Sequence, residues 1–370
     1  MSVRMIYLAT ADARGHLMRA QLLTHALRAQ GAVVDVLTTS DQGMRFLAQF
    51  GIEARLLSRH YAVQFDARQN MLRAATDANV ANYLFRPSRM LRDIWRLRAM
   101  LREADLLIND SFHPALLFMG CMPGWRHKVV HVYGASLRLA FESNFQGRVP
   151  SLLAGLFRRI VTFQIDRSRA RLEHDFCYSI VDSDTARRCG GHYRLPTPVA
   201  IVQAQAPRAA PLARRASVYL NPHFCDPLLA EALELGLAGM QAHWVGEGYA
   251  GRPGWLAHDT RWVDNAVDSD LIVSAPGMAA LSIALVYRKP ILLLVTEQPE
   301  QQINALRAQE WGLLHRTVVW RGDLPAFAAA TGDACRQLLA AAEPGMDGHA
   351  AAAQRTQAWV AALTALAQHP

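Results

Sequence analysis

Short apolar runs alternate with amphipathic segments along this chain, and the alternation occurs twice. In the first half, Arg4–Thr10 and Val33–Thr38 are strand-like, and segments with helical spacing follow them at His16–Gln30 and Met44–Phe50. This alternation is typical of a parallel sheet that is covered by helices on both faces. It predicts an α/β fold of the doubly wound, Rossmann-like type.

A change in composition separates the two halves. Pro196–Pro211 contains several prolines and alanines and few long apolar residues, as expected of a linker or hinge. Beyond it the alternation restarts, with strands expected at Ser217–Leu220, Gln241–Val245, Leu271–Ser274 and Ile291–Val295, and helices at Pro227–Leu237, Gly277–Tyr287 and Gln302–Glu310.

A length of 370 residues also favours two domains over one. We predict an N-terminal domain at 1–195, a linker at 196–213, a C-terminal domain at 214–345, and a C-terminal helix at 346–370 that could pack back on the first domain. Two tandem doubly wound domains are expected to turn the carboxyl ends of their strands toward one cleft, where ligands bind.

The composition excludes several classes of protein. Hydrophobic residues make up 51% and charged residues 19% of the chain, which rules out a disordered polypeptide. The net charge is +8, but the basic residues are scattered arginines, with Lys128 and Lys289 the only lysines, which disfavours nucleic-acid binding. Five cysteines without a C-x-x-C pair argue against a disulfide framework or a zinc site and favour the cytoplasm. No apolar run reaches the roughly 18 residues of a membrane span.

A glycine and a histidine follow the first expected strand. Gly15 would let a ligand approach the backbone, and His16 would offer an imidazole, which suits a general base at neutral pH. Asp110 ends a later strand and could pair with His16, because a neighbouring carboxylate fixes the tautomer of an imidazole and stabilises its charged form. Taken alone, His16 could instead bond to its own loop, and Asp110 could cap the turn at Ser111–His113.

A second group of residues lies within 270–305. A strand is expected to end at Ser274, and a helix begins directly after the turn Ala275-Pro276-Gly277. The unpaired N–H groups and the dipole of a helix start form a seat for an anion such as a diphosphate. Glu300 and Gln301 are expected in a later loop, where they could bind sugar hydroxyls. An ordinary strand–helix–strand crossover would explain the helix but not the Glu-Gln-x-x-Asn-Ala run.

These motifs resemble those of nucleotide-sugar glycosyltransferases of the GT-B fold, in the branch of the UDP-glycosyltransferases and the peptidoglycan N-acetylglucosaminyltransferase. The first-loop pattern Gly-His-x-x-(Pro/Arg) is matched by Gly15, His16 and Arg19. The pattern of the second domain is a glycine turn, a serine, a proline and then (Asp/Glu)-Gln-x-x-Asn-Ala. It is matched in order by Gly277, Ser282, Pro290, Glu300, Gln301, Asn304 and Ala305.

The resemblance implies a role for each matched position. His16 would be the base on the acceptor hydroxyl, with Asp110 as its partner. Donor-binding positions would be Gly15, Gly246, Val263, Ser274, Gly277, Met278, Ala279, Ser282, Glu300, Gln301 and Asn304. Among them, the N–H groups at 277–279 would bind the diphosphate, Glu300 and Gln301 the sugar, and Gly246 and Val263 the nucleobase. This scheme requires no metal and no further cofactor.

Some positions depart from the family pattern or admit another reading. Ile283 stands where many relatives have a glutamate that binds the ribose, and His223 lies in a loop that replaces a glycine-serine turn. His223 could contact a phosphate, although a surface histidine fits equally. The triplets Asp182-Ser183-Asp184 and Asp268-Ser269-Asp270 could bind a divalent metal, but capping explains them better.

Two arginine-rich segments, 86–102 and 149–171, could contact a membrane surface. In the first, Leu91, Ile94, Trp95 and Leu101 are expected on one face, opposite Arg89, Arg92 and Arg96. In the second, Leu152, Leu153, Leu156, Ile160 and Phe163 lie beside Arg158 and Arg159. Basic amphipathic helices can lie on anionic lipid, although a core-facing helix with a solvated arginine face is the simpler alternative.

The sequence therefore predicts an inverting glycosyltransferase. It would move a sugar from a nucleoside diphosphate sugar, of the UDP type, to a hydroxyl of a small-molecule or lipid-linked acceptor. We expect a cytoplasmic protein, either free or peripheral on the inner face of the membrane. The alternatives are a nucleotide-sugar 2-epimerase of the same fold and a non-catalytic relative that binds or activates a partner transferase, which Ile283 would favour.

Overall fold

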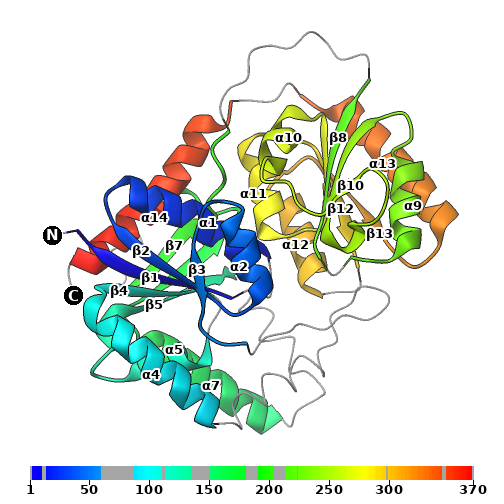
Figure 1. The fold of residues 1–370 in the computed structure, drawn as a ribbon. Helices are drawn as coiled ribbons and strands as arrows, with labels where there is room; N and C mark the ends of the chain where they lie inside the picture. Colours follow the sequence, from blue (N-terminus) through cyan, green and yellow to red (C-terminus); the bar gives the residue numbers. More distant parts are fainter. Residues whose placement is uncertain are drawn as a thin grey trace. The chain divides into compact units, whose positions relative to one another are not determined.

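The computed structural model describes residues 2–10, 14–59, 87–110, 113–135, 151–180, 191–202, 213–222, 224–296, 299–343 and 347–368. The chain forms two compact α/β units (Figure 1). The described residues of the first unit run to Pro198 and return at Gln354, and those of the second lie between Val199 and Ala353. No helix in the described ranges is both long and apolar enough to cross a bilayer.

The first unit is built on a parallel sheet with the strand order β3-β2-β1-β4-β5-β6-β7. Its strands are β1 (Arg4–Ala9), β2 (Val33–Thr38), β3 (Ala54–Leu56), β4 (Leu106–Asp110), β5 (Val129–Gly134), β6 (Ala170–Asp175) and β7 (His192–Pro196). Its helices are α1 (Arg14–Ala29), α2 (Asp41–Ala48), α4 (Pro87–Glu103), α5 (Pro114–Cys121) and α7 (Ser151–Arg167), with the short turn η1 (Arg126–Lys128).

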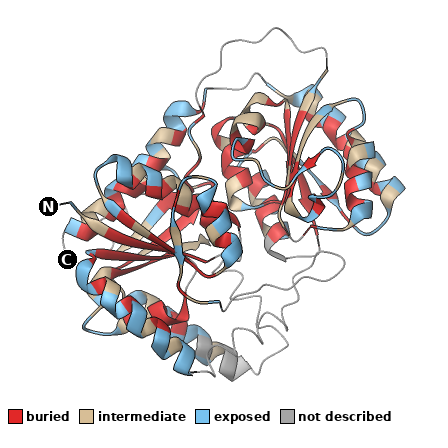
Figure 2. Ribbon diagram, in the orientation of Figure 1, coloured by how far each residue is buried: buried red, intermediate tan, exposed pale blue. Residues whose placement is uncertain are grey.

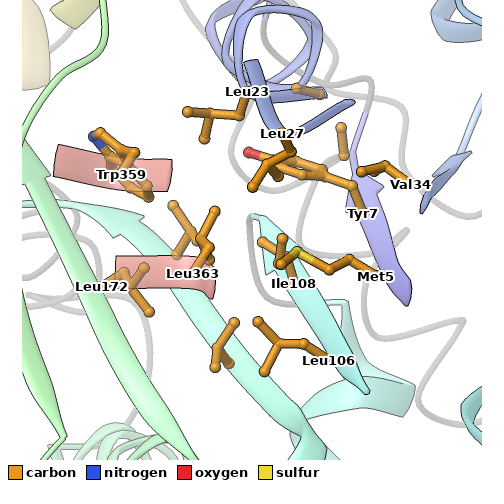
Figure 3. Close-up of a cluster of buried hydrophobic side chains, with 14 of the residues drawn as sticks. Met5, Tyr7, Leu23, Leu27, Val34, Leu106, Ile108, Leu172, Trp359 and Leu363 are labelled. Carbon is orange, nitrogen blue, oxygen red and sulfur yellow. The ribbon is translucent and has the colours of Figure 1, made fainter. Parts of the chain in front are cut away.

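Helices cover both faces of this sheet, which is why its central strands are apolar on both sides. Helices α1, α2 and α14 (His349–Gln368) pack on one face, and α4 and α5 pack on the other. In the first of these layers, Tyr7 of β1 packs with Leu23 and Leu27 of α1 and with Trp359 and Leu363 of α14 (Figure 3). The C-terminal helix therefore completes the core of the first unit.

The second unit repeats this architecture with the parallel order β10-β9-β8-β11-β12-β13. Its strands are β8 (Arg215–Leu220), β9 (Gln241–Gly246), β10 (Trp255–Leu256), β11 (Leu271–Ser274), β12 (Ile291–Val295) and β13 (His315–Val319). Its helices are α9 (Pro227–Gly236), α10 (Trp262–Asp268), α11 (Met278–Val286), α12 (Pro299–Glu310) and α13 (Leu324–Ala341), with the short turn η2 (Glu247–Tyr249). Strands β11 and β12 are buried along their whole length (Figure 2).

The fold class predicted from the sequence is confirmed, with corrections in detail. Strand β6 was not predicted because its sequence, ARLEHD, places a buried glutamate, histidine and aspartate where an apolar run was sought. Glu300 and Gln301 were expected in a loop, but they lie in the first turn of α12. Leu101 does not share an exposed face with Trp95, because Leu101 is in the core and Trp95 is 72% exposed.

Both sheets contain a point at which the strand order reverses, between β1 and β4 in the first unit and between β8 and β11 in the second. The register pairs Ala9 with Asp110 in the first and Tyr219 with Ser274 in the second. Ligands of open α/β sheets bind outside the carboxyl ends of the strands at such a switch point. We therefore expect ligand-binding sites at the two switch points.

Candidate functional site

His16 and Asp110 meet at the switch point of the first unit. Asp110 ends β4 with a fully buried side chain, whereas the His16 side chain, near the start of α1, is 24% exposed. Nδ1 of His16 lies 2.8 Å from Oδ1 of Asp110. Nε2, the other ring nitrogen, makes no hydrogen bond to the residues that the structure describes. The two residues that the sequence paired are thus in contact, and the described part of the chain leaves one nitrogen of the ring without a bond.

Asp110 is held by further donors that the sequence did not reveal. Arg19 forms a two-bond fork with the carboxylate, from Nε to Oδ2 at 2.8 Å and from Nη2 to Oδ1 at 2.5 Å. The Tyr7 hydroxyl donates to Oδ2 at 2.8 Å. Burial alone would raise the pKa of Asp110, but the charge of Arg19 and the nearby His16 outweigh it and hold that pKa well below its usual range. Asp110 is therefore ionised at neutral pH.

His174 closes this network on the far side of Arg19. Its Nε2 lies 2.6 Å from Nη1 of Arg19, and its Nδ1 lies 3.0 Å from Oγ1 of Thr197. A guanidinium can only donate, so Nε2 of His174 must accept and Nδ1 must carry the proton. Burial, followed by the charge of Arg19, lowers the pKa of His174 well below its usual value, so the ring is neutral. Sequence analysis missed His174, because the polar run Glu173-His174-Asp175 concealed the strand that places it.

The switch point of the second unit is made of backbone. Ser274 ends β11, and its hydroxyl donates to the carbonyl of Tyr219 at 3.0 Å. Gly277 is the N-cap of α11, and no side chain of the described residues caps this helix. The first intrahelical bond runs from Leu281 N to Gly277 O at 3.0 Å, so the N–H groups of Met278 and Ala279 have no partner within the helix. This arrangement can bind an anion.

Nothing in the fold requires a glycine at position 277. Its φ of −84° suits any residue, and an added Cβ would meet only the carbonyl oxygen of Ala275, at 4.0 Å. Gly248 is the opposite case, since an added Cβ there would lie 2.0 Å from the carbonyl oxygen of Phe224. The described residues thus leave the space beside Gly277 open.

Two polar side chains hold the turns that flank this helix start. Nδ2 of Asn304 donates to the carbonyl of Pro276 at 2.9 Å. Oε1 of Gln301 accepts from both the N–H and the hydroxyl of Thr296, at 2.8 and 3.0 Å. In the described part of the chain, Oδ1 of Asn304 is buried without a partner. Asn304 and Gln301 therefore support the backbone that forms the seat.

The remaining predicted donor-binding residues, Gly246, Val263 and Ser282, are buried. Ser282 is fully buried, and its hydroxyl donates to Met278 O at 2.6 Å within its own helix. An added Cβ at Gly246 would lie 3.0 Å from the indole of Trp255. Val263 is buried beside Trp262, whose indole Nε1 has no partner among the described residues. We therefore leave Ser282 out of the proposed contacts.

The last sequence-predicted positions are Gly15 and several residues that the structure does not describe. Gly15 is exposed on α1, and an added Cβ there would meet none of the described residues within 4 Å. His223, the side chain of Glu300 and the triplet Asp182-Ser183-Asp184 lie outside what the structure describes.

The second acidic triplet, Asp268-Ser269-Asp270, has a structural role. The Asp270 carboxylate accepts from the backbone N–H of Arg215 at 2.8 Å and from Nη1 of Arg214 at 3.1 Å. The described residues contain no group of three or more histidines, cysteines and acids that could hold a metal ion. Capping therefore accounts for this triplet.

The two arginine-rich segments are helices α4 and α7 of the first unit. Leu91 and Trp95 of α4 are 60% and 72% exposed, and Leu156, Ile160 and Phe163 of α7 are 55%, 46% and 53% exposed. Arg89, Arg92, Arg96, Arg158 and Arg159 are also exposed on these helices. The side chains of Leu152 and Leu153 lie outside the described residues. These helices thus expose both apolar and basic side chains.

Comparison with known proteins identifies the fold. No family model matches the sequence, and no curated protein matches it. The structure is similar to the glycosyltransferase SnogD from Streptomyces nogalater, with 17% identity, a TM-score of 0.55 and coverage of 99% of this chain and 100% of that one.

Two further structures extend this comparison. The spinosyn rhamnosyltransferase SpnG complexed with thymidine diphosphate has 16% identity and a TM-score of 0.56, with 98% of this chain and 97% of that one covered. UGT2 of Phytolacca americana, complexed with UDP-2fluoro-glucose and pterostilbene, has 10% identity and a TM-score of 0.60, with 99% and 100% covered. Similarity over the whole length at these identities establishes the fold: the chain has the GT-B fold of nucleotide-sugar glycosyltransferases.

Proposed function

We propose that this protein is an inverting glycosyltransferase that moves a sugar from a nucleoside diphosphate sugar to a hydroxyl group. The observation that carries the proposal is the His16–Asp110 pair, which has its outer ring nitrogen available at the switch point of the first unit. The uncapped start of α11, at the switch point of the second unit, supports it. The first arrangement suits proton abstraction and the second suits a diphosphate.

The reaction follows from these two chemistries. Nε2 of His16 takes the proton of the acceptor hydroxyl while its oxygen attacks the anomeric carbon. The bond from that carbon to the diphosphate oxygen breaks, and the leaving group carries away the electron pair. The N–H groups of Met278 and Ala279 stabilise the charge that develops on it, whereas the N–H of Gly277, which the resemblance assigned to the diphosphate, already donates to the Ala275 carbonyl at 2.7 Å. Attack opposite the leaving group inverts the anomeric centre, and no step calls for a metal.

The relatives support the substrate classes. SpnG has been solved with thymidine diphosphate, and UGT2 with a UDP-sugar analogue and the small molecule pterostilbene. We propose a donor of the UDP type and a small-molecule or lipid-linked acceptor. Ile283 is buried within α11, so the ribose must be bound by groups other than the side chain at this position.

A lipid-linked acceptor would give the exposed faces of α4 and α7 a role. Trp95 and Phe163 are exposed on arginine-rich helices, and such surfaces bind anionic lipid through apolar insertion and charge. We propose peripheral membrane contact there, in a protein that otherwise acts in the cytoplasm. Co-sedimentation with phosphatidylglycerol vesicles tests this directly, and equal recovery of the protein with neutral vesicles would contradict it.

A nucleotide panel followed by a turnover assay tests the proposed function. Ligand binding to the folded state raises the melting temperature, so UDP, thymidine diphosphate and GDP can be compared by thermal shift. The nucleotide that binds then defines the donor for assays of hydrolysis and transfer. A protein that binds no nucleoside diphosphate contradicts the proposal.

The same assays separate the two alternatives. Binding without transfer or hydrolysis, in a protein whose His16→Ala variant binds equally, indicates the non-catalytic relative. Conversion of the donor to its 2-epimer, visible by proton NMR, indicates the epimerase.

A further inference from the structure

Two partners approach the inner nitrogen of His16, and they make opposite demands on it. Nδ1 lies 2.8 Å from Oδ1 of Asp110 and 2.9 Å from Nη2 of Arg19. The carboxylate can only accept a hydrogen bond, and the guanidinium can only donate one. Nδ1 must therefore carry a proton to bond Asp110, or lack one to bond Arg19.

The choice decides whether His16 can act as a base. With the proton on Nδ1, the neutral ring has its lone pair on Nε2, the nitrogen that is not bonded to the described residues. With Nδ1 accepting from Arg19, the neutral ring carries its proton on Nε2 and cannot take another there. Only the first tautomer fits the proposed reaction.

Hydrogen-bond counting selects the first tautomer. Asp110 is fully buried, and its two oxygens offer about four acceptor positions. Tyr7 and Nε of Arg19 occupy those of Oδ2, and Nη2 of Arg19 occupies one of Oδ1. A proton on Nδ1 of His16 fills the fourth. The other tautomer would leave a buried carboxylate oxygen short of a donor, which is costly.

Arg19 is itself fixed in place. Its side chain is 4% exposed, and Nη1 is held by Nε2 of His174, a neutral ring that in turn bonds Thr197. The guanidinium therefore keeps the orientation in which Nε and Nη2 face Asp110. Its positive charge also lies beside the His16 ring, with Nη2 2.9 Å from Nδ1, and offsets the charge of the Asp110 carboxylate.

We propose that Arg19 is a positioning residue for His16, which turns Asp110 so that the ring proton stays on Nδ1 and which offsets the charge of that carboxylate beside the ring. The groups that set this state are Tyr7 from β1, Arg19 from α1, Asp110 from β4 and His174 from β6. This inference rests on the proposed function for its consequence, but the tautomer itself can be measured without any substrate.

Nitrogen-15 NMR of the histidine rings tests the proposal on the full chain. The shifts and two-bond couplings of each ring distinguish the Nδ1–H, Nε2–H and charged forms, and the signals lost in His16→Gln identify those of His16. In the wild-type protein at pH 8 we expect the neutral Nδ1–H form. The Nε2–H form in the wild type would overturn the proposal, and this result needs no variant to fold.

Variants of Arg19 separate its charge from its shape. In Arg19→Met, Asp110 keeps its charge without the offset, so we expect the charged form of the ring to persist to higher pH than in the wild type, and the acid limb of the activity profile to move the same way. In Arg19→Lys the charge remains, so the ring should keep its wild-type state while kcat falls and KM changes little. Arg28→Met, on the last turn of the same helix, is the matched control and should leave the His16 ring in its wild-type state.

The outcomes distinguish this inference from the proposed function. A His16 ring in the same state in Arg19→Met as in the wild type overturns the role of Arg19, whatever the activity. Should Arg19→Met not fold, Arg19→Lys and the wild-type tautomer decide the question. The expected tautomer and charge states in a protein without turnover would support the role of Arg19 in setting the ring and contradict glycosyl transfer.

Discussion

The two switch points of this protein have the same place in the topology and opposite chemistry. In the first unit, side chains near the carboxyl ends of β1, β4 and β6 take part in a network around Asp110, and hydrogen bonds link its members. In the second unit, the end of β11 presents backbone N–H groups at the start of an apolar helix, α11. Proton transfer needs a titrating side chain in a fixed tautomer, whereas a diphosphate needs donors and space. Under the proposed function, one fold would serve both tasks, with a titrating side chain at the first switch point and backbone donors at the second.

The first prediction breaks the side-chain site. His16→Ala removes the proposed base, and we expect turnover to fall about 10²- to 10⁴-fold while the affinity for the nucleoside diphosphate stays unchanged. The measurement is kcat for transfer beside nucleotide affinity by calorimetry. His25→Ala is the matched control, because His25 lies on the same helix and its Nε2 bonds the carbonyl of Phe50. Full activity in His16→Ala would remove this residue from the mechanism.

The second prediction concerns the stability of the same network. Arg19→Met leaves a fully buried carboxylate without its cation, and breaking such a pair costs about 3–5 kcal/mol of unfolding free energy. Urea unfolding measures this loss. Arg28→Met removes one bond from Nη2 of Arg28 to the carbonyl of Val34, which is worth about 0.5–1.5 kcal/mol. Equal losses of unfolding free energy in the two variants would mean that the bonds from Arg19 to Asp110 stabilise the protein no more than the single bond of Arg28.

The third prediction uses pH to isolate the charge of Asp110. Its pKa is well below its usual range in the folded protein, because the charge of Arg19 and the nearby His16 outweigh the effect of burial. The unfolded chain therefore takes up a proton first as the pH falls. The stability contributed by Asp110 is present at neutral pH, begins to fall below about pH 4, and is lost through the lower folded-state value.

Asp110→Asn is the reference for this effect, because an amide does not titrate in that range. The difference in unfolding free energy between the wild type and Asp110→Asn should be largest at pH 7 and shrink from pH 4 to pH 3. Urea unfolding at pH 7, 5, 4 and 3 measures it. A difference that grows on acidification would show that the folded protein binds the proton more tightly than the unfolded chain, contrary to the network described.

The contrast between the sites also explains what the sequence could reveal. The strand–helix alternation predicted the fold because apolar periodicity reports burial directly, and His16 and Gly277 could be found because each follows an apolar strand at a turn. Arg19 and His174 are 155 residues apart in the chain, and their contact depends on the strand order. No local pattern carries that information, since an arginine on a helix is ordinarily solvated.

Burial was the other property that the sequence could not supply. Ser282 and Asn304 occupy positions that the resemblance assigned to donor binding, and the structure turns the Ser282 hydroxyl into its own helix and the Asn304 amide onto Pro276. A motif fixes which residue stands at a position, and packing decides which way its side chain points. Two predictions at the second switch point make use of this difference.

The fourth prediction fills the open space at the backbone site. Gly277→Ala places a Cβ where only the Ala275 carbonyl oxygen lies nearby, at 4.0 Å. Alanine is a poorer N-cap than glycine but restricts the unfolded chain, so stability should change by no more than about 0.5 kcal/mol. Nucleotide affinity should fall about tenfold, or about 1.4 kcal/mol, because the added methyl group occupies space beside the N–H groups at the start of α11.

Gly248→Ala is the matched contrast for this prediction. An added Cβ there would lie 2.0 Å from the Phe224 carbonyl oxygen, so this variant should lose stability. Thermal unfolding and calorimetry with the preferred nucleotide separate the two effects. Unchanged affinity in Gly277→Ala would place the diphosphate elsewhere.

The fifth and smallest effect is expected at Ser282. Its buried hydroxyl bonds only Met278 O, which the helix backbone also satisfies, so Ser282→Ala leaves no polar group unpaired. Alanine is also the better helix former, and the two changes together should keep the unfolding free energy within about 0.5 kcal/mol of the wild type. Nucleotide affinity, measured by calorimetry, should not change. A fivefold loss of affinity in a variant of unchanged stability would mean that the hydroxyl turns to the ligand on binding. The second switch point would then use a side chain as the first one does.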